Sequence, residues 1–492
     1  MREKYESLAL ADLKAIAKAR GLKGTSTMKK GELVELMLAE DEKDKAEGKG
    51  MQSKTATPTP AKSFVKAEGK TEGRPEARNV SVAEGRVEGR SEGYKPELKA
   101  DNREEARQDE DKFPAELDSG IAASGILEVM PDGYGFIRCE NFLPGDHDVY
   151  VAPSQIRRFG LKTGDILEGN TRVRTQGEKF AALLYVKSIN GYTPEEAAKR
   201  CNFEDMTPIF PDERLHLERP GSSVAMRVVD LLSPVGKGQR GMIVSPPKAG
   251  KTTLLKDVAK SIKRNSPEVH LIILLIDERP EEVTDIKEAI EGPNVEVIYS
   301  TFDELPEHHK RVSEMVIERG KRLVEHKKDV MILIDSITRL TRAYNLTVPP
   351  SGRTLSGGLD PAALHMPKRF FGAARNMREG GSLTILATAL VDTGSKMDDV
   401  VYEEFKGTGN MELVLDRKLS EKRVFPAIDI PKSGTRREDL LLTADELEAI
   451  NIIRKALNSL KPEEAVDKIL DLFSKTRNNQ EFVHMVKKMK WF

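Results

Sequence analysis

The stretch from Gly241 to Lys256 constrains this chain more than any other part of its sequence. It begins with a short apolar run typical of a strand, passes through two prolines, and takes on the residue pattern of a helix near Gly250. A turn between a strand and a helix can direct backbone N–H groups, and the positive end of the helix dipole, at a phosphate. We therefore predict a phosphate-binding loop.

Three residues of this loop have distinct expected tasks. Gly250 lets the backbone approach closely, Lys251 reaches the phosphate oxygens, and the Thr252 hydroxyl binds Mg²⁺. Ser245 stands where the generic pattern G-x-x-x-x-G-K-[ST] has its first glycine, so the full pattern is not met. Because Gly-Lys-Ser/Thr arises by chance in roughly one chain in three or four of this length, its place between strand and helix signals decides the interpretation.

Charge balance, cysteine count and the length of the apolar runs exclude several classes of protein. The chain has 79 Lys and Arg against 80 Asp and Glu, so any binding of nucleic acid must come from local patches. Its two cysteines, Cys139 and Cys201, exclude a disulfide framework and indicate a reducing, cytoplasmic setting. The longest apolar runs are strand-sized, and we expect neither a membrane span nor a signal peptide.

Shifts in periodicity and composition divide the chain into segments. Residues 48–118 are rich in Glu, Lys, Arg, Gly and Pro and too poor in apolar residues to offset the entropy of ordering, which predicts a disordered linker. The predicted segments are a helical module at 1–47, that linker, an OB-type barrel at 119–190, a connector at 191–224, an α/β core at 225–442 and a helical segment at 443–492.

The predicted barrel carries aromatic residues in a strand pattern. Tyr134 and Phe136 alternate with glycine and should lie on one face of a strand, where Tyr150 can join them. Such rings, with arginines that contact phosphates, are what single-stranded nucleic acid requires, although ordinary barrel core is the alternative. The segment resembles a cold-shock-type OB barrel. The arginines in question are Arg138, Arg157 and Arg158.

Acidic residues follow two predicted strands of the α/β core. Asp277 and Glu278 come after the strand 270–276, and Asp335 follows the strand 330–334. Carboxylates at the carboxyl end of parallel strands project into the crevice where ligands bind. Singly they fit strand-end caps as well, but their order after a phosphate loop indicates a nucleotide and magnesium site.

Two loops and several arginines have more than one interpretation. The glycine-rich loop 351–359 and the loop 393–398, with Lys396, fit contacts with a polynucleotide backbone or plain linkers. An arginine far from the phosphate loop can act on the nucleotide of a neighbouring subunit, although surface ion pairs are the usual fate of arginine. The candidates are Arg417, Arg423 and Arg436.

Taken together, these motifs resemble the family of bacterial transcription termination factors called Rho. The resemblance covers the helical module, the barrel and the α/β core, and leaves out the linker. The stretches that carry it are Pro246–Thr252, Asp277–Thr284, Asp335–Arg342, Lys368–Asn376 and Tyr402–Met411.

The resemblance implies a ring-shaped homohexamer of RecA-like ATPase domains that binds ATP between subunits and moves along RNA 5′ to 3′. It implies Glu278 as the base, Arg436 as the arginine finger with Arg279 beside it, and Phe425 as the adenine platform. It further implies that Mg²⁺ binds at Thr252 and Asp335. It implies a primary RNA site that adds Phe180 to the barrel residues, and a second RNA site at Gly357 and Lys396. The implied nucleotide site consists of Lys248, Ala249, Gly250, Lys251, Thr252 and Thr253.

The resulting expectation is an ATP-dependent translocase or helicase that binds nascent, cytosine-leaning single-stranded RNA and dismantles transcription complexes. RNA polymerase and elongation factors are its expected partners. Two alternatives stay open: another RecA-like ATPase, such as a rotary ATP synthase subunit or a DNA recombinase, and an RNA chaperone whose α/β core is only a scaffold. The Tyr134–Phe136 barrel argues against the first, and Glu278 with Asp335 argues against the second.

Overall fold

The computed structural model describes residues 29–31, 34, 115–457 and 462–489. The predicted N-terminal module and linker therefore lie almost entirely outside the described residues. The chain divides into two compact units, Met1–Lys99 and Ala100–Phe492, and the second holds nearly all that is described. Within the described part, no helix is both long and apolar enough to cross a membrane.

A closed five-stranded barrel opens the second unit, in the order β1-β2-β3-β5-β4. Alternating apolar residues such as Leu127, Ile137 and Leu167 fill its interior and are almost fully buried. The predicted barrel is confirmed. The elements are η3 Ala115–Leu117, β1 Asp118–Val129, β2 Gly135–Arg138, β3 Val149–Val151, α4 Pro153–Phe159, β4 Ile166–Arg172 and β5 Ala181–Ile189.

The α/β core is built on a nine-stranded sheet with the main order β14-β13-β7-β12-β10-β8-β9, and β11 and β6 attached beside β12. Neighbours from β13 to β9 are parallel, as the alternation of predicted strands and helices indicated. The strands are β6 Pro208–Ile209, β7 Arg240–Ser245, β8 His270–Glu278, β9 Val295–Thr301, β10 Asp329–Asp335, β11 Arg375–Met377, β12 Ser382–Leu390, β13 Met411–Val414 and β14 Gly434–Thr435.

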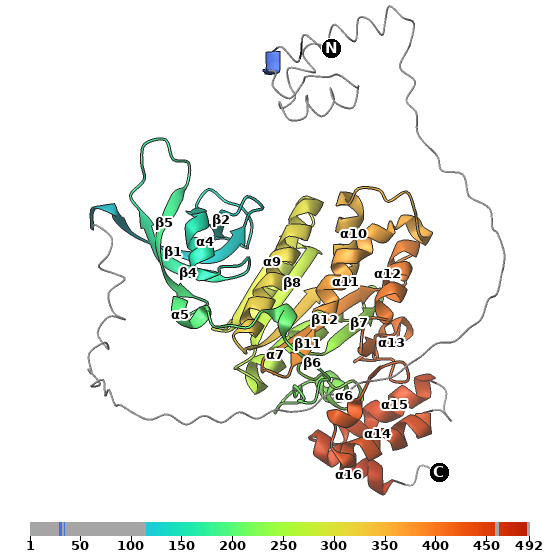
Figure 1. The fold of residues 1–492 in the computed structure, drawn as a ribbon. Helices are drawn as coiled ribbons and strands as arrows, with labels where there is room; N and C mark the ends of the chain where they lie inside the picture. The colour runs from blue at the N-terminus through green and yellow to red at the C-terminus, as the bar shows by residue number, and fades with distance from the viewer. Residues whose placement is uncertain (1–28, 32–33, 35–114, 458–461, 490–492) are drawn as a thin grey trace, which may run out of the picture. The chain divides into compact units, whose positions relative to one another are not determined.

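Helices cover both faces of this sheet (Figure 1). Side chains alternate along β8, so that Leu271 and Ile273 join one apolar cluster while Ile272 and Leu274 join the other. The first cluster takes in α6 Val224–Leu232, α7 Lys251–Asn265, α8 Pro280–Ala289, α13 Arg417–Glu421, α14 Ala444–Leu457, α15 Pro462–Ser474 and α16 Asn479–Lys488. The second takes in α9 Pro306–Glu325, α10 Ile337–Thr347, α11 His365–Gly372 and α12 Lys396–Lys406.

Short elements complete the connections. They are α5 Pro194–Ala197, η4 Phe203–Asp205, η5 Ser356–Gly358, η6 Pro361–Leu364 and η7 Glu438–Leu440. Because the central strands are parallel and in register, their carboxyl ends meet at one edge of the sheet. The loop after β7 and the acidic ends of β8 and β10 are thereby brought together.

Gly238 offers a test of this packing. It has φ +86°, and a Cβ there would overlap the backbone of Asn376. We expect Gly238→Ala to lower the free energy of unfolding by at least about 2 kcal/mol, because the turn before β7 would have to move. Gly221→Ala is the control, since Gly221 has φ +75° and nothing within 4 Å of such a Cβ. Equal denaturant midpoints for the two variants would contradict the close approach.

Candidate functional site

The predicted phosphate loop lies between β7 and α7. Gly250 caps the helix with φ 90°, a left-handed conformation that only glycine adopts without strain. Lys248 also has a positive φ, and its carbonyl accepts a hydrogen bond from Ser420 Oγ at 2.9 Å. Ala249 is buried, whereas Lys248 and Thr253 are exposed. The loop is thus shaped locally by Gly250 and fixed from outside by α13.

Lys251 lies between two carboxylates. Its Nζ is 3.2 Å from Glu278 Oε1 and 2.5 Å from Asp335 Oδ1, and Thr388 Oγ1 donates to the same Asp335 oxygen at 2.8 Å. Glu278 and Asp335 are almost fully buried, at 3% and 1% exposure. The first residue of α7 and the last residues of β8 and β10 therefore form one ionic cluster at the carboxyl edge of the sheet.

The cluster shifts the pKa of Glu278 and of Lys251. Burial raises the pKa of Glu278 above its usual value, and the nearby charge of Asp335 adds to the rise. Burial alone would lower the pKa of Lys251, but the carboxylates of Asp335 and Glu278 outweigh it, so that the net shift is upward. Glu278 therefore holds a proton more readily than an exposed carboxylate does, which suits a general base.

Arg339 belongs to this site, although sequence analysis assigned it no role. It donates to the backbone oxygen of Asp277, and its Nη1 lies 3.3 Å from Glu278 Oε1. Ser336 caps α10 by accepting from the Arg339 N–H, which places Arg339 in the first turn of the helix after β10. An arginine three residues after such a cap was the signal available in the sequence.

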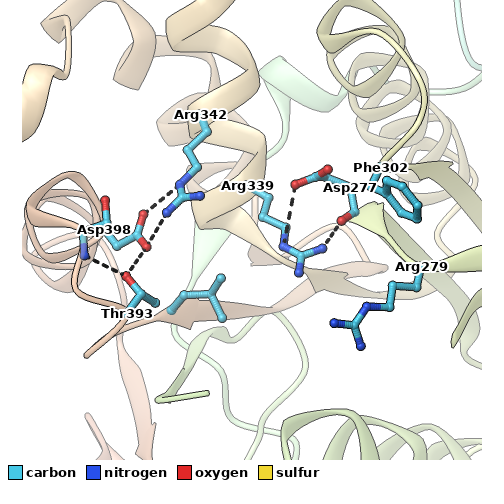
Figure 2. A pocket seen from close by; sticks show the side chains of 9 residues that line it. Asp277, Arg279, Phe302, Arg339, Arg342, Thr393 and Asp398 are labelled. Atoms are coloured by element: carbon cyan, nitrogen blue, oxygen red, sulfur yellow. Dashed lines mark hydrogen bonds and ion pairs between the residues drawn. The ribbon is translucent and has the colours of Figure 1, made fainter. Parts of the chain in front are cut away.

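A cavity of about 540 Å³ opens beside Arg339 at the carboxyl edge of the sheet (Figure 2). Arg279 caps α8, is exposed, and shows no interaction with another drawn residue in Figure 2. On the opposite side Arg342 is paired with Asp398, which also accepts from Thr393 Oγ1 at 2.6 Å. The cavity is thus lined by three arginines, of which Arg279 is the most accessible.

The expected magnesium ligands, Thr252 and Asp335, are both next to Lys251: Thr252 follows it in α7, and Asp335 contacts its ammonium group. The Thr252 hydroxyl is half-buried, 3.5 Å from Glu282 Oε2, and Asp335 ends the neighbouring β10. In the described ranges no group of three His, Cys, Asp or Glu side chains lies ready to hold a metal. Hydroxyl and carboxylate oxygens are the donors Mg²⁺ prefers, and with nucleotide oxygens they make a fitting set.

Phe425 and Arg436 lie in different places. The Phe425 ring is 53% exposed, and a Cβ on Gly250 would be 4.0 Å from it, so the ring borders the phosphate loop. Arg436 is exposed and lines a separate cavity of about 390 Å³ with Lys406 and Arg454. None of the residues Pro246–Thr252 lines that cavity, so Arg436 lies apart from the phosphate loop of its own chain.

Four aromatic rings meet on the barrel. Phe136 is central, with ring centroids 5.8 Å from Tyr134, 6.0 Å from Tyr150 and 5.2 Å from Phe180. All four side chains are half-buried, so the rings are neither core nor fully exposed. The structure therefore assembles the expected platform, whose binding of RNA stays a prediction.

Arg138 differs from expectation. We predicted a phosphate contact, whereas its guanidinium is 5% exposed, paired with Asp148 and Glu128, and lies 4.8 Å from the Phe136 ring. The structure thus shows Arg138 as a buried, paired cation beside the aromatic rings, and its contact with RNA stays a prediction. Arg157 and Arg158 lie exposed on α4, as phosphate contacts would require.

The two glycine-punctuated loops touch each other. Gly357 has φ +78°, and a Cβ there would overlap the backbone of Lys396 and Met397, at the start of α12. Lys396 is exposed. The loops predicted as a second nucleic-acid site thus form one surface within the chain.

Comparisons with known proteins agree with this arrangement. Family models match at residues 123–195 (Rho termination factor, RNA-binding domain), 225–435 (ATP synthase alpha/beta family, nucleotide-binding domain) and 4–43 (Rho termination factor, N-terminal domain). Transcription termination factor Rho of Pseudomonas aeruginosa is 57% identical over 75% of this chain and 88% of its own length. The Bacillus subtilis protein of that name is 57% identical over 75% of this chain and 86% of its own.

A solved ATPase from the type III secretion system of pathogenic bacteria shares the fold, with a TM-score of 0.50 and 20% identity over 64% of this chain and 93% of that one.

The raised pKa of Glu278 generates a test. If ionised Glu278 takes up a proton, kcat/KM for ATP should fall as pH falls through its pKa, at a midpoint above the ordinary carboxyl value of 4.5. Glu278→Gln should lower kcat at least about 100-fold. Glu281→Gln is the matched control, since Glu281 is exposed on α8. A wild-type profile flat down to pH 4.5 would contradict the assignment.

Proposed function

The chain belongs to the Rho family of transcription termination factors, and on that premise we propose that it is an ATP-driven RNA translocase or helicase that ends transcription. The observation that best supports this proposal is that one chain contains both a nucleotide-type ionic cluster and an aromatic surface. Lys251, Glu278 and Asp335 form the cluster, and four aromatic rings lie together on the barrel. A nucleotide site and a base-stacking platform are the two parts that such a motor requires.

At the nucleotide site each residue has a proposed task. Lys251 shares its charge with the phosphates, assisted by the exposed Lys248, while N–H groups at Gly250 and Thr252 face them. Glu278 accepts the proton of the attacking water, and its raised pKa makes it a stronger base than an exposed carboxylate. Thr252 and Asp335 would hold Mg²⁺, which neutralises charge on the phosphates. Phe425 would stack on the adenine.

The working form is proposed to be a homohexameric ring. Arg436 lies in a cavity apart from its own phosphate loop, which supports a role as arginine finger toward the nucleotide of the next subunit. Arg279, exposed beside the cavity of Figure 2, would support that site. Gly357 and Lys396 would line the central channel and contact the RNA backbone.

The barrel is proposed to capture nascent single-stranded RNA. Bases stack on Tyr134, Phe136, Tyr150 and Phe180, with Arg157 and Arg158 near the phosphates. RNA polymerase and its elongation factors are the proposed partners, and the cytoplasm is the proposed setting. The match to the ATP synthase alpha/beta nucleotide-binding domain covers residues 225–435 only, whereas the match to the Rho RNA-binding domain at 123–195 favours the proposed function over an ATP synthase subunit or a DNA recombinase.

Phosphate release with and without poly(C) tests the proposal most directly. We expect the rate to rise at least about tenfold with poly(C), because RNA held in the ring completes the active arrangement. Single-stranded DNA of the same length is the control ligand. A rate indifferent to RNA would rule out a translocase.

Lys251→Ala separates the two sites. We expect ATP turnover to fall at least about 100-fold, because a charge-assisted contact to the phosphates is lost. Binding of poly(C) in a filter assay should stay within about twofold of wild type, because the aromatic platform is on the barrel. Lys256→Ala is the matched control, since Lys256 is a half-buried lysine of the same helix whose partner is Asp285. Loss of both activities together would contradict the two-site arrangement.

A further inference from the structure

One carboxylate joins the barrel to the α/β core. Arg311, on α9, places its Nη2 2.7 Å from Glu128 Oε1 and 2.6 Å from Glu128 Oε2, on barrel strand β1. The same Glu128 Oε2 accepts from Arg138 Nε at 2.7 Å. Glu128 therefore lies between an arginine of the core and an arginine of the barrel, and it cannot move without disturbing both.

At the barrel end, this chain of contacts reaches the aromatic platform. The Arg138 guanidinium lies over Phe136, the ring that contacts the other three. Since Arg138 and Asp148 are almost fully buried, their position depends on well-formed pairing rather than on water. A shift of Glu128 would therefore change the position of Arg138 and of the surface on which bases stack.

At the core end, the contacts lead to Glu278. Two residues before Arg311 on α9, His309 Nδ1 shares a 2.7 Å hydrogen bond with Ser300 Oγ of β9. The next residue, Thr301, pairs in register with Glu278. Asn141 of the barrel fixes the same edge strand, because its side chain bonds both the N–H and the carbonyl of Tyr299, at 3.0 and 2.5 Å.

We propose that Glu128 and Arg311 are positioning residues that make the activity of the nucleotide site depend on RNA held by the barrel. The proposal rests on the proposed function, since it presupposes RNA-stimulated ATP hydrolysis. The proposal predicts energetic coupling between the two residues in the RNA-dependent step.

Arg311→Gln tests the proposal, because Gln keeps a hydrogen-bond donor and removes the charge. Arg311 is 34% exposed and Glu128 16%, so the loss should be moderate. We expect phosphate release without RNA to stay within about twofold of wild type, and the poly(C)-stimulated rate to fall about fivefold or more. Poly(C) affinity measured without nucleotide should change less than about threefold. Arg311→Lys should recover part of the stimulation.

Arg264→Gln is the matched control, since Arg264 lies exposed at the end of α7. Glu128→Gln alone and combined with Arg311→Gln completes a double-mutant cycle. The poly(C)-stimulated rate of the double variant should lie within about twofold of the rate of the slower single variant. Additive losses, or equal loss of basal and stimulated rates, would overturn the proposal and assign the pair to stability alone.

The wild-type protein distinguishes the two hypotheses. A wild-type rate that does not respond to poly(C) refutes the proposed function and this inference with it. A wild-type rate that responds, together with an Arg311→Gln variant that responds equally, overturns only the inference.

Discussion

A single ammonium group held between two buried carboxylates is the interaction on which the rest of this structure depends. Lys251 begins α7, while Glu278 and Asp335 end neighbouring parallel strands. Burying three charges is costly unless they are paired, so the surrounding sheet must hold them in register. The same register brings the phosphate loop to the carboxylates. The sheet is thus the support that makes this cluster possible, and the cluster is the feature that a nucleotide would use.

The barrel follows a different physical logic. Its aromatic rings are half-buried and contact one another, so part of their apolar surface stays accessible to solvent. Stacking tolerates many bases, whereas ionic pairing requires fixed partners. The pairing of Arg138 with Asp148 and Glu128 therefore holds the support of the aromatic surface in one position, while the rings themselves can stack on different bases. At the junction with α9, the Glu128 carboxylate serves both parts of the molecule.

Much of the fold could be predicted because periodicity is a local property. The strand–turn–helix pattern around Gly250 and the apolar runs before Asp277 and Asp335 located the site to within a residue or two. The rings at Tyr134 and Phe136 were placed together by simple alternation. The burial of Arg138 was not predicted, because its partners Glu128 and Asp148 are each ten residues away, and a residue pattern does not reveal which charge is buried. Arg339 was overlooked although its place three residues after Ser336 was visible in the sequence, because its partners Asp277 and Glu278 end a different strand.

The sequence by itself determined the chemistry that is available: a phosphate loop, two strand-end carboxylates, an aromatic strand face and a set of arginines. Only the tertiary structure decided which charges meet. It pairs Lys251 with Glu278 and Asp335, withdraws Arg138 from solvent, and leaves Arg436 in a cavity apart from its own phosphate loop. The physical reason is that pairing and burial of charge depend on contacts between residues far apart in the chain, which local propensity does not encode.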